Sequence, residues 1–386
     1  MRNTRYADQC PKPLGDSDFS MRNNKVSLDN AWEGCQKAGP GCDHCYAETR
    51  NVRFGGGTAI NWGPGAPRRR TSEANRRKPL RWNAGHDRFF AEHGRRQRVF
   101  CESLGDWLDN AVPVEWLVDL LDTIRVTQNL DWLLLSKRIG NWQSRLEAAS
   151  DHAFNHRRDE LHQWIAAWLD GRAPQNVRIG ATVCDQKEAD RDIPKLLQVP
   201  ALVRFLSMEP LLGPVDIADY LVPGYPNCQG FEQGNQMESG YCGRCGGHVS
   251  DSIHDRMKRD TVDWVIVGGE SGPAARPMHP EWARCLRDQC ASHNVPFMFK
   301  QHGEWAPGSG DFGAGRYETA AIARDGRVVA GGYEAKGYPG GSSSADGWTM
   351  VHRAGKKAAG RLLDGVQHDG FPTLGGSLTK MMGEIR

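Results

Sequence analysis

The chain of 386 residues is long enough to bury a sizeable core in one large domain or two, and its net charge is only +2. Hydrophobic residues make up 39% of it and charged residues 25%, which is typical of a soluble globular protein. No run of eighteen apolar residues is present, and the N-terminus lacks the apolar segment of a signal peptide, so we expect no membrane span and a cytoplasmic location. In that reducing compartment the eleven cysteines are better candidates for metal ligands than for disulfides.

A short apolar stretch, KVSL (25–28), is followed by six apolar runs rich in β-branched residues, with helical or loop segments between them. The runs are RVFCES (98–103), WLLLSKR (132–138), VRIGATV (177–183), LVRFLSMEP (202–210), WVIVGGE (264–270) and PFMFKQ (296–301). Their continuous apolar character predicts strands buried on both faces, as in a parallel sheet. Helical patterns lie at 46–54, 113–127, 186–198 and 279–293. The alternation predicts an α/β fold, in the form of a partial (β/α) barrel.

Two segments interrupt this alternation. Residues 213–260 form a long insertion between the fourth and fifth apolar runs, and residues 306–347 are rich in Gly and Ser, so we expect the latter to be loop-like. Helical periodicity returns around Lys356 to Leu363. We therefore divide the chain into an N-terminal extension (1–27), a partial barrel with its insertion (28–305) and a loop-rich, then helical tail (306–386).

A polar residue stands at or beside the end of each of the six apolar runs. These residues are Glu102, Lys137, Thr182, Glu209, Glu270 and Lys300. In β/α barrels the loops that follow the strands converge at that end, and the chemistry collects there. The series predicts a polar barrel mouth.

Three cysteines, Cys35, Cys42 and Cys45, lie in EGCQKAGPGCDHCYAE between the first apolar stretch and a predicted helix. Three thiolates on one loop can hold three irons of a four-iron cluster and leave the fourth iron open, and the glycines allow the loop to wrap closely around a bound object. Zinc is the second interpretation; it would need a fourth protein ligand, for which His44 is poorly placed and a distant His is required. Plain thiols are the third, and spacing alone leaves all three open.

Between Ala66 and Arg98 the chain has eleven Arg or Lys against three Asp or Glu. This composition predicts a polyanion-binding surface, although a solvated basic face is the alternative. The residues expected to contact nucleic acid are Arg68, Arg69, Arg70, Arg76, Arg77, Lys78 and Arg81.

The 213–260 insertion contains a second cysteine group, Cys228, Cys242 and Cys245, with His248 nearby. The knuckle spacing of YCGRCGGH predicts that these four residues bind zinc, which would stabilise a segment too poor in apolar residues to fold unaided. A second iron–sulfur cluster and unliganded thiols are the alternatives. We expect no metal role for the other cysteines, which are Cys10, Cys101, Cys184, Cys285 and Cys290.

Six ordered blocks between about residues 28 and 372 resemble one protein family. They are GCQKAGPGCDHCYAE, LLLSKR, FLSMEPLLGP, VIVGGESGP, FKQHGEW and GKKAAGRLLDG. The chain resembles the phage-associated, radical-SAM-like proteins named for two mycobacteriophage gene products, within the radical S-adenosylmethionine (SAM) superfamily. The superfamily usually has three residues in the first gap of its cysteine motif; the six found here are shared by this group.

The resemblance implies a 4Fe-4S cluster at the three cysteines and SAM bound to its open iron, with Lys137 and Glu209 as catalytic residues. It also implies a SAM site built from residues that follow the strands, although the usual motif of two glycines and an acid after the second strand is not cleanly present. The residues expected there are Glu102, Ser103, Asp106, Thr182, Gly268, Gly269 and Glu270. Arg138, beside Lys137, is expected to meet a carboxylate or phosphate.

The function that follows from the resemblance is a radical SAM enzyme that modifies nucleic acid. Its most specific form is an isomerase of phage DNA hypermodification, which converts an N-linked to a Cα-linked glycine on thymidine. DNA and a reductant such as flavodoxin or ferredoxin would be its partners, in the host cytoplasm if the chain is phage-encoded. A radical SAM lyase or repair enzyme, a tRNA-base modifier, and a non-catalytic, zinc-stapled nucleic-acid-binding protein are the alternatives.

Overall fold

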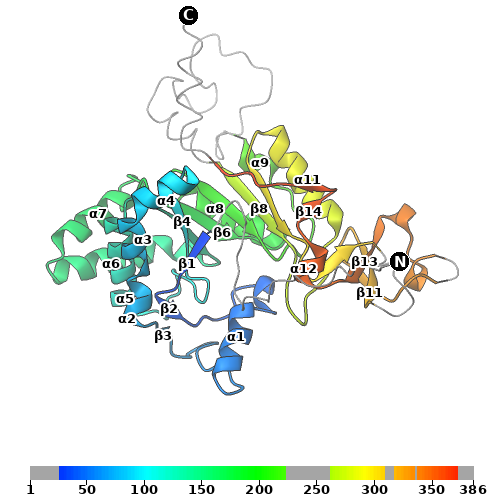
Figure 1. Cartoon of the computed structure of the whole chain (residues 1–386), viewed down its shortest axis with the longest axis horizontal. Coiled ribbons are helices and arrows are strands. Elements are labelled where there is room, and N and C mark those ends of the chain that lie inside the picture. The colour runs from blue at the N-terminus through cyan, green and yellow to red at the C-terminus, as the bar shows by residue number, and fades with distance from the viewer. Residues whose placement is uncertain (1–25, 223–260, 309–316, 335–336, 373–386) are drawn as a thin grey trace, which may run out of the picture.

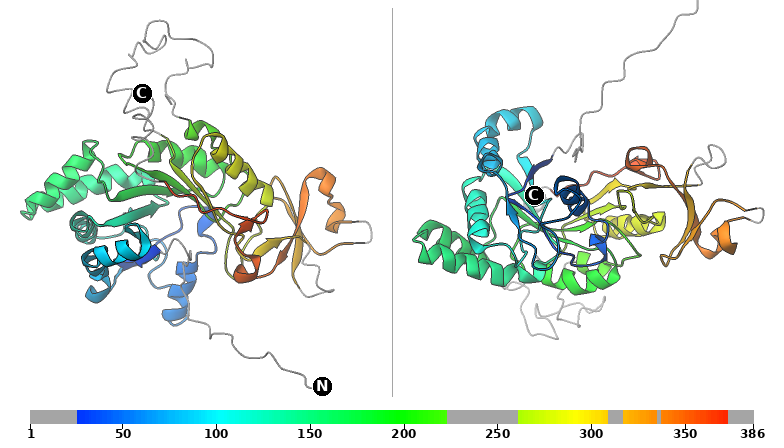
Figure 2. Two further views of the ribbon diagram at one scale, coloured as in Figure 1. Left: turned by 45° about the horizontal axis from the view of Figure 1, so that its top comes forward. Right: turned by 90° about the horizontal axis from the view of Figure 1, so that it is seen from below.

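The computed structural model describes residues 26–222, 261–308, 317–334 and 337–372, and its centre is one curled sheet of seven parallel strands (Figures 1 and 2). In spatial order the strands are β1 (Val26–Asp29), β4 (Gln97–Cys101), β5 (Leu130–Ser136), β6 (Val177–Thr182), β7 (Arg204–Met208), β8 (Trp264–Gly268) and β9 (Phe297–Gln301). Each strand lies beside its predecessor in the series, so every crossover joins neighbours. The predicted strands are confirmed, and the sheet has the form of half a barrel.

Helices follow most of these strands and pack on the outer face of the sheet (Figures 1 and 2). They are α5 (Val114–Val126), α6 (Trp142–Asn155), α7 (Asp159–Leu169), α8 (Gln186–Leu197), α9 (Ala218–Leu221) and α11 (Pro280–Ser292), with a 3-10 turn, η2 (Ile139–Asn141), before α6. The helices predicted at 113–127, 186–198 and 279–293 are therefore confirmed.

Alternate residues of most of the strands pack in two different cores. Val99 and Cys101 of β4 point outward and pack in the large cluster beneath the helices. On the inner face Phe205, Trp264 and Met298 form a smaller cluster, against which Phe371 packs. Because both faces are covered, the strands read as continuous apolar runs in the sequence.

The N-terminal third adds small elements beside the first strand. They are β2 (Trp32–Glu33), η1 (Pro40–Cys42), α1 (Tyr46–Phe54), β3 (Arg69–Arg70), α2 (Glu73–Arg76), α3 (Lys78–Ala84) and α4 (His86–His93). The helix predicted at 46–54 is confirmed as α1, and β2 pairs with β3 in a small antiparallel sheet. The segment between β2 and α1 carries the three cysteines.

The C-terminal part departs from its prediction. A second, antiparallel sheet of order β10-β13-β11-β12 lies at the far side of β9, where loops were expected (Figure 1). Its elements and those that follow are β10 (Trp305–Pro307), β11 (Thr319–Ala323), β12 (Val328–Ala330), η3 (Pro339–Gly341), η4 (Ser344–Asp346), β13 (Trp348–Arg353), α12 (Lys356–Ala359), β14 (Leu362–Leu363) and β15 (Val366–Gln367). The helix expected around Lys356 to Leu363 is only four residues long, since Gly355 and Gly360, both with positive φ, flank it.

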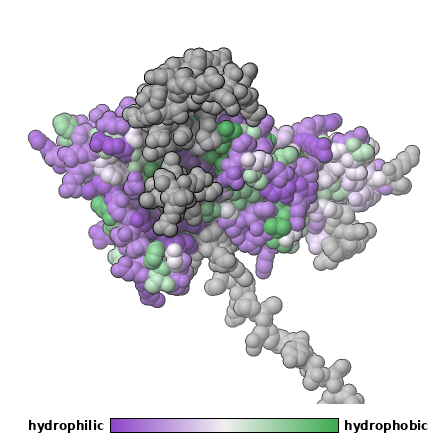
Figure 3. Space-filling view, turned by 90° about the horizontal axis from the view of Figure 1, so that it is seen from above, coloured by the Kyte–Doolittle hydropathy of each residue, from purple (hydrophilic) through white to green (hydrophobic). Residues whose placement is uncertain are grey.

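On the face seen in Figure 3 the described surface is mostly hydrophilic, and its apolar patches are small and separate. None of the helices in the described part of the chain combines the length and apolar character needed to cross a membrane.

Candidate functional site

The loop that carries the three cysteines lies against the carboxyl ends of the parallel strands. Beyond β4, the carbonyl of Leu104 accepts a hydrogen bond of 2.9 Å from the Gly34 N–H. Arg138 after β5, Cys184 after β6 and Glu270 after β8 also touch the loop. Residues far apart in the sequence therefore fix one short segment at the predicted barrel mouth.

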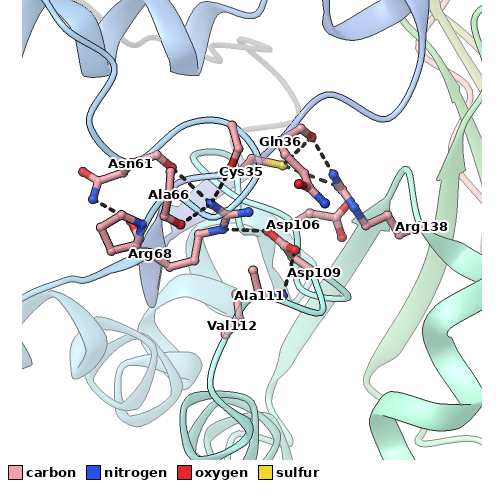
Figure 4. Close-up of polar contacts among 12 residues, drawn as sticks. Cys35, Gln36, Asn61, Ala66, Arg68, Asp106, Asp109, Ala111, Val112 and Arg138 are labelled. Carbon is pink, nitrogen blue, oxygen red and sulfur yellow. Dashed lines mark hydrogen bonds and ion pairs between the residues drawn. The ribbon is translucent and has the colours of Figure 1, made fainter.

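Cys35 is held by the residues that follow β5 (Figure 4). A guanidinium nitrogen of Arg138 lies 3.4 Å from Cys35 Sγ and 3.1 Å from a carboxylate oxygen of Asp106, and the same side chain donates to the Gln36 carbonyl. Burial, with the nearby negative charge of Asp106, raises the pKa of Cys35 to about 12, although Arg138 opposes the shift. Binding of a metal would therefore displace a proton from this thiol.

Cys42 and Cys45 lie further along the loop, and Cys42 is close enough to Cys45 to influence its pKa. Cys45 precedes α1, and its pKa is raised by burial although the first N–H groups of that helix oppose the shift. Burial also opposes the charge on Lys137, but the neighbouring Cys184 and Cys42 outweigh it, and the pKa of Lys137 is raised. Lys137 and Arg138 thus bring two cations to the cysteine loop.

The glycines of the loop are required by the protein itself. A Cβ atom on Gly41 would lie 2.2 Å from Cys184 Sγ and 3.4 Å from Lys137 Nζ, and one on Gly39 would lie 2.0 Å from a carboxylate oxygen of Glu188. We expected these glycines to wrap around a bound object; the structure shows that they approach the β6–α8 junction. No local pattern in the sequence indicated that Cys184 and Glu188 touch this loop.

Glu270, beyond β8, forms a further attachment of the loop. It is 5% exposed and accepts hydrogen bonds of 2.7, 2.8 and 2.6 Å from the backbone and side chain of Arg276, and it lies 3.1 Å from His44 Nδ1. Arg276 also donates to the Pro40 carbonyl and to Asp43. Burial alone would raise the pKa of Glu270, but the contacts from Arg276 and His44 prevail and the pKa is lowered.

Glu209, the second predicted catalytic residue, is anchored by the end of β9. Its carboxylate accepts 2.6 Å from Lys300 Nζ and 2.8 Å from Gln301. A Cβ on Gly268 would lie 2.9 Å from this carboxylate, and one on Gly269 would lie 2.0 Å from the His302 carbonyl. These two glycines therefore allow close packing of β8 against its neighbours.

Three residues after β4 that were predicted to bind SAM form hydrogen bonds with other residues of the protein. Glu102 is 3% exposed and accepts a 2.6 Å hydrogen bond from the Ala31 N–H, and burial raises its pKa well above the usual range. Asp106 is 4% exposed and accepts from Ser136, Lys137 and Arg138. The Ser103 hydroxyl contacts Asn30, and its carbonyl accepts from Tyr46. Thr182, the predicted SAM contact after β6, is also buried.

Arg68 was expected on the nucleic-acid surface, and this prediction is wrong. Its side chain has no exposed area and pairs with buried Asp109 at 2.8 Å (Figure 4). By contrast Arg69 and Arg77 are well exposed, although each contacts a glutamate. Of the other residues predicted to contact nucleic acid, Arg70 pairs with Asp119, Arg76 donates to the Thr71 carbonyl and Lys78 donates to Asn75. Arg81 is exposed.

Metal ligands were predicted at two places. Cys228, Cys242, Cys245 and His248 lie outside the described residues. In the described ranges no three Cys, His, Asp or Glu side chains surround a single ion position. A four-iron cluster takes one thiolate per iron, so its ligands spread around the cluster, and three unpaired thiols on one loop fit that requirement.

Fold and site define a parallel α/β half-barrel with a three-thiol loop fixed at its carboxyl edge. The chain belongs to the DUF5131 family, described as proteins of unknown function, whose model matches residues 26–372. No curated protein and no solved structure matches the chain.

Proposed function

We propose that the chain is a radical SAM enzyme that acts on nucleic acid. The observation that carries the proposal is the loop of Cys35, Cys42 and Cys45, which is anchored at the carboxyl ends of a curled parallel sheet. In β/α barrels this edge collects the reacting groups, and three thiolates leave one iron of a four-iron cluster open.

The residues of the site have separate roles in this proposal. The three cysteines hold a 4Fe-4S cluster, while Lys137 and Arg138 offset its negative charge. When bound, the cluster and SAM supply a 5′-deoxyadenosyl radical for hydrogen abstraction. Glu209, fixed by Lys300, presents a carboxylate at the same edge, where SAM or the substrate can be oriented.

The substrate class rests on the basic segment and on the resemblance of the six sequence blocks. Arg69, Arg77 and Arg81 are exposed and suited to contact phosphates. The specific reaction we propose is isomerisation of an N-linked to a Cα-linked glycine on thymidine in DNA. It is chemically reasonable because a glycyl Cα–H bond is activated towards hydrogen abstraction. The bond from the glycine nitrogen to the thymine methyl carbon would break as the bond from Cα to that carbon forms, and one electron from the reductant with one proton would quench the resulting radical. The target base would have to be flipped from the duplex, and flavodoxin or ferredoxin would supply electrons.

Anaerobic purification and reconstitution test the metal assignment. We expect brown protein with about four irons bound at the first cysteine motif, lost in Cys35→Ala, Cys42→Ala and Cys45→Ala. Cys285→Ala is the matched control, because this thiol is exposed on α11, away from the loop, and its iron content should equal that of the unaltered protein. Colourless protein that binds only zinc would refute the proposal and support the non-catalytic, zinc-stapled alternative.

The reaction is tested in two further steps. Reduced enzyme with SAM should release 5′-deoxyadenosine, and mass spectrometry of nucleosides from treated phage DNA should reveal a thymidine isomer of unchanged mass and altered retention. A product of different mass would favour the lyase or repair alternative, and activity on tRNA alone would favour the tRNA-base modifier.

A further inference from the structure

The two residues that follow β5 bring two cations to different parts of the cysteine loop. Arg138 lies 3.4 Å from Cys35 Sγ, and Lys137 Nζ lies 3.4 Å from the position of a Cβ on Gly41, between Cys35 and the other two cysteines. Both residues directly follow Ser136, the last residue of β5, so the end of this one strand reaches both parts of the loop. Among the described residues Arg138 is the side chain that donates a hydrogen bond to a sulfur of the loop, whereas the Cys45 sulfur is contacted by the backbone N–H groups of Ala47 and Glu48.

The orientation of Arg138 is fixed by Asp106 (Figure 4). Side chains of both residues are largely buried, with 11% and 5% of their surface exposed, and they lie 3.1 Å apart. Asp106 is itself held by the Ser136 hydroxyl at 2.7 Å and the Lys137 N–H at 3.0 Å. The guanidinium is thus locked between a carboxylate, the Gln36 carbonyl and the Cys35 sulfur, an arrangement that requires the planar fork of arginine.

We propose that Arg138 is a positioning residue that, held by Asp106, donates a hydrogen bond to the Cys35 sulfur of the bound cluster and favours its one-electron-reduced form. The inference rests on the proposed function, because it assumes that the thiol loop binds an iron–sulfur cluster. Reduction adds one electron from an external one-electron donor and makes the centre one unit more negative, with no proton transferred. Hydrogen bonds to the cluster's sulfurs and fixed positive charge stabilise the more negative state.

An EPR-monitored redox titration with dithionite as the electron donor measures this effect directly. We expect Arg138→Gln to reduce the ratio of reduced to oxidised cluster about tenfold at a fixed solution potential, a shift of about 59 mV to lower potential for a one-electron couple. Arg138→Lys should shift the potential in the same direction but less, since it keeps the charge and loses the fork.

Arg276→Gln is the matched control. This variant also removes one positive charge that contacts the cysteine loop, but Arg276 contacts Pro40 and Asp43 rather than a cysteine sulfur. We expect it to loosen the loop and lower the iron content while the potential of the assembled cluster changes much less than in Arg138→Gln. Equal shifts in the two variants, or an unchanged potential in Arg138→Gln, would overturn the inference.

The titration separates this inference from the function on which it rests. Unaltered protein that assembles no cluster refutes the function, and the role of Arg138 with it. A cluster that assembles normally but is insensitive to Arg138 refutes only the role. If Arg138→Gln fails to assemble, Arg138→Lys gives the second reading, because it keeps the positive charge and loses only the fork that reaches the sulfur; an unchanged potential in Arg138→Lys would then overturn the inference.

Discussion

The contact of Gly41 with Cys184 gives a sharp test of the loop position that needs no cofactor. Gly41 has no positive φ, so alanine is compatible with its backbone conformation and any penalty is steric. The added Cβ would lie 2.2 Å from Cys184 Sγ, and ordinary contacts begin at 3.4 Å, so the loop or the buried thiol must move by about 1.2 Å. Overpacking of this kind costs about 1–3 kcal/mol.

Removing the sulfur should relieve the clash. Cys184→Ala alone leaves a small cavity and should cost about 1–2 kcal/mol. In the double variant the alanine at position 41 occupies the vacated space, so the destabilisation of the double variant should equal that of Cys184→Ala by itself. The expected coupling free energy is therefore about 1–3 kcal/mol in favour of the double variant.

Urea denaturation of the two single variants, the double variant and the unaltered protein, all in one metal state, measures this coupling. Gly213→Ala is the control, because it also lacks a positive φ and its nearest neighbour would be 3.9 Å away. The free energy of unfolding of this control should differ from that of the unaltered protein by no more than about 0.5 kcal/mol. Strictly additive effects of the two substitutions would show that the loop does not lie on Cys184, and the proposed site would lose its geometric basis.

Three further predictions concern charged residues. Burial raises the pKa of Asp29 to about 7, so the folded state binds an extra proton and the stability of the protein falls as the pH rises from about 4 to 7. Urea denaturation should therefore show that Asp29→Asn is more stable than the unaltered protein at pH 8, by about 2–4 kcal/mol, and no more stable at pH 4. Arg68→Gln should cost about 3–5 kcal/mol of stability, because it leaves buried Asp109 unpaired, and it should not change the salt dependence of the proposed DNA binding. Arg77→Gln should be nearly neutral in stability and should lower the slope of log affinity against log salt concentration by about one. Glu270→Gln should cost about 1–2 kcal/mol of stability at pH 7. Because the pKa of Glu270 is lowered in the folded protein, the difference in stability between the variant and the unaltered protein should vanish as the pH falls through the folded pKa. A difference that does not depend on pH would contradict the ion pair.

The strands were predictable because both faces of the sheet are covered. Runs such as 132–138 and 264–270 are apolar without alternation, and the order of the strands along the sheet follows the order along the chain. The strands β11 and β12 were missed because they are short, Ala-rich or exposed, and lie in a Gly-rich context that favours loops. They are formed by antiparallel pairing with each other and with β13, which a local pattern does not encode.

The position of the three cysteines at the strand ends was predictable, and the contacts that fix them were not. Glu102 and Asp106 were expected to face a ligand because they follow a strand, but their carboxylates turn to backbone and side-chain donors of the protein. The count of basic residues could not separate buried Arg68 from its exposed neighbours, since its partner Asp109 is 41 residues away. Arg276 lies well beyond its strand, and nothing in its local sequence links it to a loop 236 residues earlier.

That last separation has a consequence for the making of the protein. The cysteine loop leaves the ribosome 236 residues before Arg276, and its clamp at Pro40 exists only after residue 276 has been synthesised and the strands up to β8 have paired. Until then the thiols are carried by a segment without its permanent neighbours, exposed to oxidation or to stray metal ions. If the loop binds iron as proposed, its loading is therefore a late event in biogenesis, and expression at low temperature, with iron delivered after synthesis, should give more loaded protein than iron supplied only during translation.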